Sequence, residues 1–264
     1  MRILLIVIIF KLISINAYSS PKSLMNSWEI QKYKLQDQNV LDLSFDIRIK
    51  GQSEELSKQK KYGKIKDLYY TLYWLPSGSI DVKVNGLEGK WRELRTNLKS
   101  NLYGVVEVLF PTSLFKVTRG YEMSLVGNKT VKAEDKSFQK AFQEMLFKFD
   151  KVGVLTEIKS KNSLGTQILT FINEKTRVTK NNYITKKIIK KNFYGPRTIN
   201  SIIDISYGKV GKYFLPKSLE LTTELSVPPG ADKKIKNRVI KKNSEIEFSN
   251  FSVNKNVAMK YFKK

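Results

Sequence analysis

The sequence predicts an α+β protein built on a large, strongly curved antiparallel sheet. Segments in which apolar and polar residues alternate recur along the chain, turn sequences separate them, and few stretches have helical spacing. Alternation with a period of two is typical of a strand with one buried and one wet face. Together these patterns favour roughly ten strands and three helices in a single sheet-based architecture.

The strand Leu41–Lys50 has the clearest pattern, since every odd-numbered position is apolar and every even-numbered position is polar or charged. Leu68–Leu75 is apolar on both faces and ends at a Pro-Ser-Gly turn. Such a strand is either buried on both sides by the core, or covered on one face while the other faces a ligand. The other strands expected in this half are 80–84, Tyr103–Phe110, Tyr121–Leu125 and its hairpin partner Lys129–Lys132.

Three segments have apolar residues at helical spacing: Leu24–Leu35, Lys90–Leu98 and Phe138–Phe149. The third is the most unusual because its apolar stripe is bulky. The stripe comprises Phe138, Ala141, Phe142, Met145, Leu146 and Phe149. It fits either core packing or a movable plug over a cavity, to whose irregular surface Met adapts well.

The second half returns to strands, expected at Val152–Ile158, Gly165–Ile172, Ile199–Tyr207, Tyr213–Leu225 and Ser244–Val253. The segment Lys175–Ile203 carries eight basic residues and no acidic one. It fits a solvated loop, an edge strand protected by Lys, or a contact with anionic lipid head groups or lipopolysaccharide. The candidate contact residues are Lys186, Lys187, Lys190, Lys191 and Arg197.

The composition excludes several kinds of chemistry. The 264 residues contain no Cys and no His, so disulfides, thiolate catalysis and Ser-His-Asp devices are absent. Neither metal-ligand spacing nor a phosphate-binding glycine loop is visible, and we expect no cofactor, no metal and no enzyme. The net charge of +24 favours attraction to polyanions, or reflects a Lys-rich composition whose charges are solvated.

The first nineteen residues predict export. Arg2 precedes an apolar run over 3–10, and Ala17-Tyr18-Ser19 offers the small residues that a signal peptidase accepts. Without Cys there is no site for acylation, so we expect a cleaved periplasmic protein that is not a lipoprotein. Export also argues against a nucleic-acid partner. Residues 20–264 are expected to form one domain, with an alternative boundary near Asp150.

The C-terminal third has a familiar order of motifs. A strand over 203–207 leads into Tyr-Phe-Leu-Pro-Lys at 213–217, and a later strand ends in Phe-Ser-Asn-Phe-Ser-Val-Asn at 248–254. This order resembles the LolA/LolB-like family of periplasmic lipoprotein-sorting and lipid-carrier proteins. The resemblance implies a half-open β-barrel whose apolar cavity is covered by plug or lid helices. Arg48 is its positional candidate for the family's cavity-mouth Arg.

The leading hypothesis is therefore a monomeric, non-enzymatic carrier of a lipid or lipoprotein acyl chain. The candidate cavity residues are Phe45, Ile47, Tyr70, Leu72, Trp74, Phe138, Phe142, Met145 and Phe149. Two alternatives stay open. One is an envelope interaction or sensor module of the same fold without a lipid ligand, and the other is a hydrolase that uses carboxylates or Lys.

Overall fold

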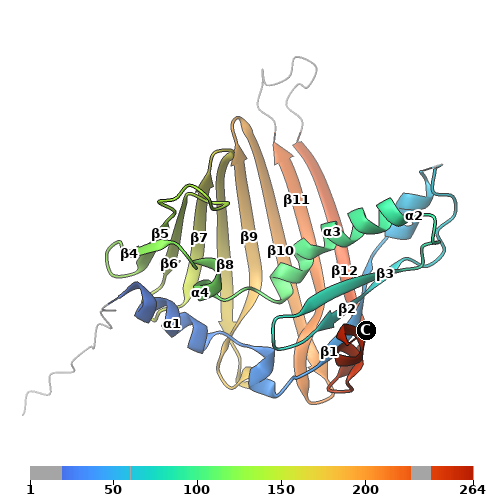
Figure 1. Ribbon diagram of the computed structural model, residues 1–264, viewed down its shortest axis with the longest axis horizontal. Helices are drawn as coiled ribbons and strands as arrows, with labels where there is room; N and C mark the ends of the chain where they lie inside the picture. The colour runs from blue at the N-terminus through green and yellow to red at the C-terminus, as the bar shows by residue number, and fades with distance from the viewer. Residues whose placement is uncertain (1–19, 60, 227–238, 264) are drawn as a thin grey trace, which may run out of the picture.

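The computed structural model describes residues 20–59, 61–226 and 239–263. Their architecture is one antiparallel sheet of twelve strands, with helices packed mainly on one face (Figure 1). The spatial order is β3-β2-β1-β12-β11-β10-β9-β8-β7-β6-β5-β4, so the sheet is open and β3 and β4 are its edges. The predicted α+β class with a large antiparallel sheet is confirmed. The expected signal peptide lies outside the described residues.

The strands are β1 (Leu43–Ile49), β2 (Tyr69–Trp74), β3 (Ile80–Asn85), β4 (Glu122–Leu125), β5 (Thr130–Glu134), β6 (Glu144–Phe149), β7 (Leu155–Asn162), β8 (Gly165–Lys175), β9 (Tyr183–Tyr194), β10 (Arg197–Val210), β11 (Tyr213–Ser226) and β12 (Val239–Val253). The α-helices are α1 (Pro21–Gln31), α2 (Gln52–Ser57), α3 (Arg92–Leu109), α4 (Leu114–Val117) and α5 (Val257–Phe262). Short 3-10 turns occupy Leu35–Gln38 and Arg177–Thr179.

The topology joins the start of the described chain to its end. From β4 to β12 each strand pairs with the next one in sequence, which makes a continuous meander. The first strand, β1, then adds beside the last, with Leu43 opposite Val253 and Ile49 opposite Ile246. Strands β2 and β3 extend the sheet beyond β1. Asp150 lies in the turn between β6 and β7, which pair with each other.

We call the side that carries α1, α3 and α4 the helix face, and the opposite side the outer face (Figure 1). The helix face holds two apolar clusters. The major core packs α3 against β1–β3 and β10–β12, and includes Phe45, Tyr70, Leu102, Leu219 and Ile246. The minor core packs α1 and α4 against β4–β7, and includes Leu24, Trp28, Val131 and Phe147.

Helix α3 forms because apolar residues recur every four positions along it. Leu94, Leu98, Leu102 and Val106 are all buried against the sheet. Neither end of α3 has a side-chain cap, and Gly104 lies in its interior. An interior Gly costs a helix about 1 kcal/mol relative to Ala. Burial of the apolar stripe, rather than helix propensity, therefore holds α3 in place.

Helix α5 packs on the outer face of β1 and β2. The buried Asp42 carboxylate accepts hydrogen bonds from the backbone N–H of Val257 (3.0 Å) and Met259 (2.9 Å), and so caps the helix. The Tyr261 ring stacks on Tyr73, with ring centroids 3.8 Å apart. These contacts fix the last described helix to the strands at the start of the sheet.

Two predicted elements are wrong. The predicted strand Tyr103–Phe110 is instead the second half of α3 up to Leu109, followed by its C-cap Phe110, because the four-residue apolar repeat that begins at Leu94 continues through it. Phe138–Phe149 is not a helix: its first part is a loop and its end is β6. In β6, residues Met145, Phe147 and Phe149 are buried on one face and alternate with less buried positions, so strand pairing with β5 and β7 prevails.

Most strand predictions are confirmed, including the hairpin of β4 and β5. The segment Lys175–Ile203 is neither a loop nor an edge strand. It contains β9, which lies between β8 and β10 near the middle of the sheet. Its lysines therefore sit on a paired, central strand, and do not protect an edge.

Candidate functional site

Five candidate cavity residues lie together on the helix face of β1 and β2. Phe45, Ile47, Tyr70, Leu72 and Trp74 are each at most 5% exposed and belong to the major core. Register explains why they meet, since Phe45 is opposite Leu72 and Ile47 is opposite Tyr70. The odd positions of β1 and the even positions of β2 thus share one face. The alternation of β1, together with the two-residue period of any strand for the even positions of β2, predicted this grouping.

The end of α3 covers this group. The Phe110 ring follows the last turn of α3 and lies 5.6 Å from Trp74 and 6.5 Å from Phe45, measured between ring centroids. Phe248 and Phe251 of β12 approach Phe45 to 5.4 and 5.2 Å. A side chain lining a vacant, water-sized hollow would keep accessible area there. The Phe45 side chain is only 1% exposed, so this group is packed in the present conformation.

One polar atom is buried within the group. The Tyr70 hydroxyl donates a hydrogen bond of 2.7 Å to the side-chain carbonyl of Gln52 on α2. Burial raises the pKa of this hydroxyl to about 12, against a smaller lowering by the same hydrogen bond. The tyrosine is therefore neutral at physiological pH and ties α2 to the apolar face of β2.

The apolar surface of the helix face extends beyond α3. Leu169 and Phe171 on β8 and Ile203 on β10 point to this face, are only half-buried, and pack against the major core. Phe171 also packs against the minor core. The two clusters are thus joined across β8 by partly accessible apolar side chains. Such a surface suits an elongated apolar ligand that lies along the helix face.

The remaining candidate cavity residues lie elsewhere. Phe142, Met145 and Phe149 pack in or against the minor core beside α1. Phe138 is 77% exposed and has a positive φ of 56° in the loop before β6. They form no lid helix, and the helix that covers the major core is α3. The predicted helix Lys90–Leu98 is too short, although the apolar spacing from Leu94 to Leu98 continues to Leu102 and Val106.

The five candidate basic residues do not form one patch. On β9 the side chains of Lys186 and Lys190 alternate with those of Lys187 and Lys191, so the two pairs lie on opposite faces. Arg197 is exposed at the start of β10. The Lys187 ammonium pairs with the Asp204 carboxylate at 2.9 Å.

Arg48 also lies away from the helix face. Its guanidinium pairs with Asp67 and lies 5.0 Å from the centroid of the Tyr69 ring. Positions 45 and 47 of β1 point into the major core, so position 48 points to the outer face. In this structure Arg48 therefore does not line an opening of the apolar surface.

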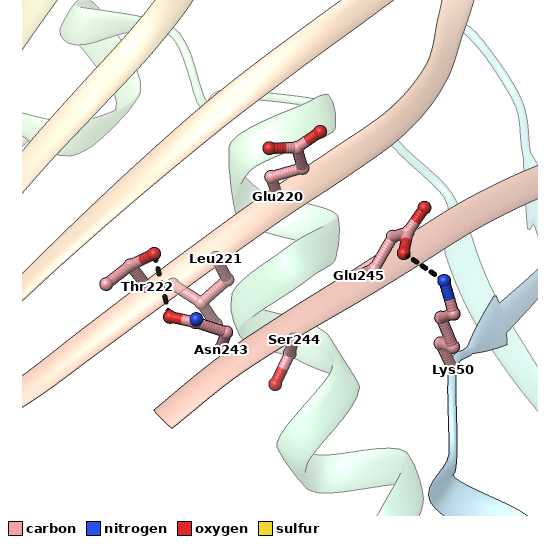
Figure 2. Close-up of a pocket in the computed structure, with 7 residues that line it drawn as sticks. All are labelled: Lys50, Glu220, Leu221, Thr222, Asn243, Ser244 and Glu245. Carbon is pink, nitrogen blue, oxygen red and sulfur yellow. Dashed lines mark hydrogen bonds and ion pairs between the residues drawn. The ribbon is translucent and has the colours of Figure 1, made fainter. Parts of the chain in front are cut away.

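A polar depression of about 460 Å³ lies where β12 extends beyond the end of β1 (Figure 2). It is lined by Lys50, Glu220, Leu221, Thr222, Asn243, Ser244 and Glu245. The Lys50 ammonium pairs with Glu245 at 2.8 Å, and the Thr222 hydroxyl donates to Asn243 at 3.1 Å. Its open, hydrogen-bonded lining does not suit an acyl chain.

One carboxylate links α3 and α5. Asp81 on β3 accepts from the Tyr261 hydroxyl at 2.6 Å and pairs with the Lys99 ammonium at 2.5 Å. Burial raises the pKa of Asp81, but the hydrogen bonds from Lys99 and Tyr261 outweigh it and leave the pKa below its usual value. This arrangement is structural, since Lys99 and Tyr261 both bind the same carboxylate and so hold α3 and α5 to β3.

In the part of the chain that the structure describes, no group of three or more acidic residues is arranged to hold a metal ion. Within the same residues, no helix is long and apolar enough to cross a membrane. No family model, curated protein or solved structure matches the chain. The resemblance to the LolA/LolB-like family stays a prediction.

Proposed function

We propose that this protein is a non-enzymatic periplasmic carrier that binds the acyl chain of a lipid or lipoprotein on the helix face of its sheet. The observation that supports this most is the open sheet whose helix face carries large apolar side chains covered by one long helix. The absence of His and Cys from the sequence favours binding over catalysis. The proposed location depends on the apolar N-terminal segment of the sequence.

In this proposal α3 is the lid. Its four buried stripe residues contribute about 1.5–3 kcal/mol each, or about 6–12 kcal/mol in all, to holding it on the sheet. Burial of an acyl chain contributes about 0.8 kcal/mol per methylene, so a chain of about fifteen methylenes recovers about 12 kcal/mol. The two contributions are similar in size. Cargo can therefore replace α3 on the helix face and leave again without covalent chemistry.

The carrier proposal is tested by extracting the purified protein and analysing the extract by lipid mass spectrometry. A fluorescent fatty-acid probe, titrated into delipidated protein and displaced by unlabelled lipid, measures binding directly. We expect a stoichiometric lipid or saturable probe binding. The proposal is refuted if no lipid co-purifies with the protein and the probe does not bind saturably.

The packed state of Phe45 and its neighbours also supports a second candidate, an envelope interaction module of the same fold that binds no lipid. Both candidates agree with the present conformation, because a closed carrier and a permanently filled core bury the same side chains. They differ in whether lipid displaces α3 from the sheet. For the interaction module, lipid titration leaves α3 protected from backbone hydrogen exchange, whereas for the carrier it removes that protection.

A further inference from the structure

The outer face of the central strands carries apolar side chains that are exposed or half-exposed. We call Ile168, Ile172, Ile189 and Ile202 the outer isoleucine patch. Ile172 is 48% exposed and Ile202 is 38% exposed. The helices α1, α3 and α4 lie on the opposite face of these strands (Figure 1). Large apolar residues that gather on a solvated sheet face mark an interaction surface.

Strand register makes the patch contiguous. Ile189 on β9 lies directly opposite Ile202 on β10 and opposite Thr170 on β8. Ile168 and Ile172 flank Thr170 two positions away on the same face. Phe193, 38% exposed, extends the patch along β9 toward the turn before β10.

Three lysines border the end of this patch that is nearest to the turn between β9 and β10. Lys159 on β7 and Lys191 on β9 are both opposite Ile168, and Lys161 is opposite Thr166. All three are exposed, and none forms an ion pair within the described residues. We call these three residues the lysine rim.

The carboxylates nearest to the rim are bound to other lysines. Glu144 pairs with Lys132 at 3.2 Å, and Glu157 pairs with Lys148 at 2.7 Å. The unneutralised positive charge therefore stays beside the isoleucines of β8 and β9.

Glu134 on β5 is likewise bound to Lys132 and Lys136. Five further acidic residues of the outer face lie away from the rim, on β10–β12. They are Asp204, Glu220, Glu224, Glu245 and Glu247. The outer face is thus basic and apolar over β7–β9, and acidic over β10–β12.

We propose that the outer isoleucine patch and the lysine rim form a docking surface for an anionic phospholipid bilayer. Basic side chains are attracted to the negative head groups, and exposed Ile and Phe side chains enter the boundary between head groups and acyl chains. The surface is on the opposite face from the proposed cargo site, so docking leaves α3 free to move. The inference extends the carrier proposal but does not depend on cargo.

The test is co-sedimentation of the full chain with vesicles of phosphatidylglycerol and phosphatidylcholine, compared with vesicles of phosphatidylcholine alone, at low and high salt. We expect binding only to the anionic vesicles, and loss of most binding at high salt. Each basic residue beside an anionic surface strengthens partitioning by about fivefold. The triple variant Lys159→Gln, Lys161→Gln, Lys191→Gln should therefore weaken it by about a hundredfold.

A matched triple variant controls for net charge. Lys83, Lys116 and Lys209 are exposed, form no ion pair among the described residues and lie outside the patch, so their replacement by Gln should leave most of the binding intact. A second variant, Ile172→Thr with Ile202→Thr, keeps β-branched residues on both strands. It should weaken binding several-fold without changing its dependence on salt.

The inference is overturned if wild-type protein ignores anionic vesicles, or if both lysine triples lose binding equally. It is also overturned if the rim triple abolishes a salt-sensitive self-association while vesicles are never bound, because the occupant would then be a second copy. Fatty-acid probe uptake, measured without vesicles, separates the two proposals. Normal uptake without vesicle binding removes only the docking surface, and vesicle binding without uptake removes only the carrier.

Discussion

Replacement of Leu102 by Ala tests whether α3 is the lid. Leu102 is 2% exposed at the centre of the helix stripe, and truncation of a buried Leu to Ala costs about 2–5 kcal/mol. If α3 leaves the sheet when cargo enters, the substitution destabilises only the closed form, in which α3 is packed on the sheet. A loss of 2 kcal/mol raises the ratio of open to closed protein about thirtyfold. The apparent Kd for a fluorescent fatty acid should fall by the same factor, until the open form predominates.

The matched control is Leu155→Ala. Leu155 is buried in the minor core on β7 and contacts neither β1 nor β2 in the sheet order. Urea denaturation should show a similar loss in the free energy of unfolding for both variants, while fluorescence titration shows tighter probe binding for Leu102→Ala only. Unchanged or weaker binding by Leu102→Ala, at a confirmed loss of stability, would refute the assignment of α3 as the lid.

Three further predictions concern the fold. Asp42→Ala removes the cap of α5 and should lower stability by about 1 kcal/mol, seen as a fall in Tm of about 2–4 °C in a circular dichroism melt; an unchanged Tm would contradict the capping role. Phe147→Ala should cost about 3–5 kcal/mol because that ring is fully buried in β6, whereas Phe138→Ala should change the free energy of unfolding by less than about 0.5 kcal/mol; equal effects in urea denaturation would refute the assignment of β6. The pKa of Asp81 is lower in the folded protein than its unfolded value of 3.8, so its ion pair stabilises the fold above that pH and the contribution is lost as pH falls below it. The difference in Tm between wild type and Asp81→Asn should therefore shrink below about pH 4, and a difference that stays constant would contradict this.

Strands with one buried and one wet face could be predicted from the sequence. The alternation of Leu41–Lys50 predicts β1 because its odd positions all enter the major core. Tyr69–Trp74 has apolar residues on both faces, yet its burial alternates in the structure. One apolar side chain of its outer face, Tyr73, is covered by the Tyr261 ring from α5. Nothing local in the sequence reveals that contact.

The two wrong elements have a common cause. Both segments contain apolar residues that satisfy more than one period. In Tyr103–Phe110, three Val residues favour a strand by propensity, and tertiary packing of the longer α3 stripe overrides it. In Phe138–Phe149, a helical stripe coincides with the two-residue alternation of Met145, Phe147 and Phe149, and pairing partners on both sides decide in favour of the strand.

The candidate site was predicted in part. The five residues of β1 and β2 share a face as expected, because side-chain direction in a strand follows from its period. The helix that covers these five residues was not predicted, because the position of α3 over them depends on the three-dimensional path of the chain after β3. The division of the β9 lysines between two faces was also missed. The run Lys-Lys-Ile-Ile-Lys-Lys at 186–191 has no two-residue alternation, because both faces of β9 are half-covered.

The pairing of β1 with β12 makes the order of synthesis matter. Leu43 pairs with Val253, which is synthesised 210 positions later, so β1 lacks its β12 neighbour until most of the chain has been made. Closing so long a loop is slow compared with forming the successive hairpins of β4 to β12. A chain that stopped before residue 239 would leave β1–β3 unpaired with β4–β11 and would split the major core, in which α3 packs against both groups of strands. Premature termination in the last tenth of this protein should therefore be as damaging as loss of its beginning.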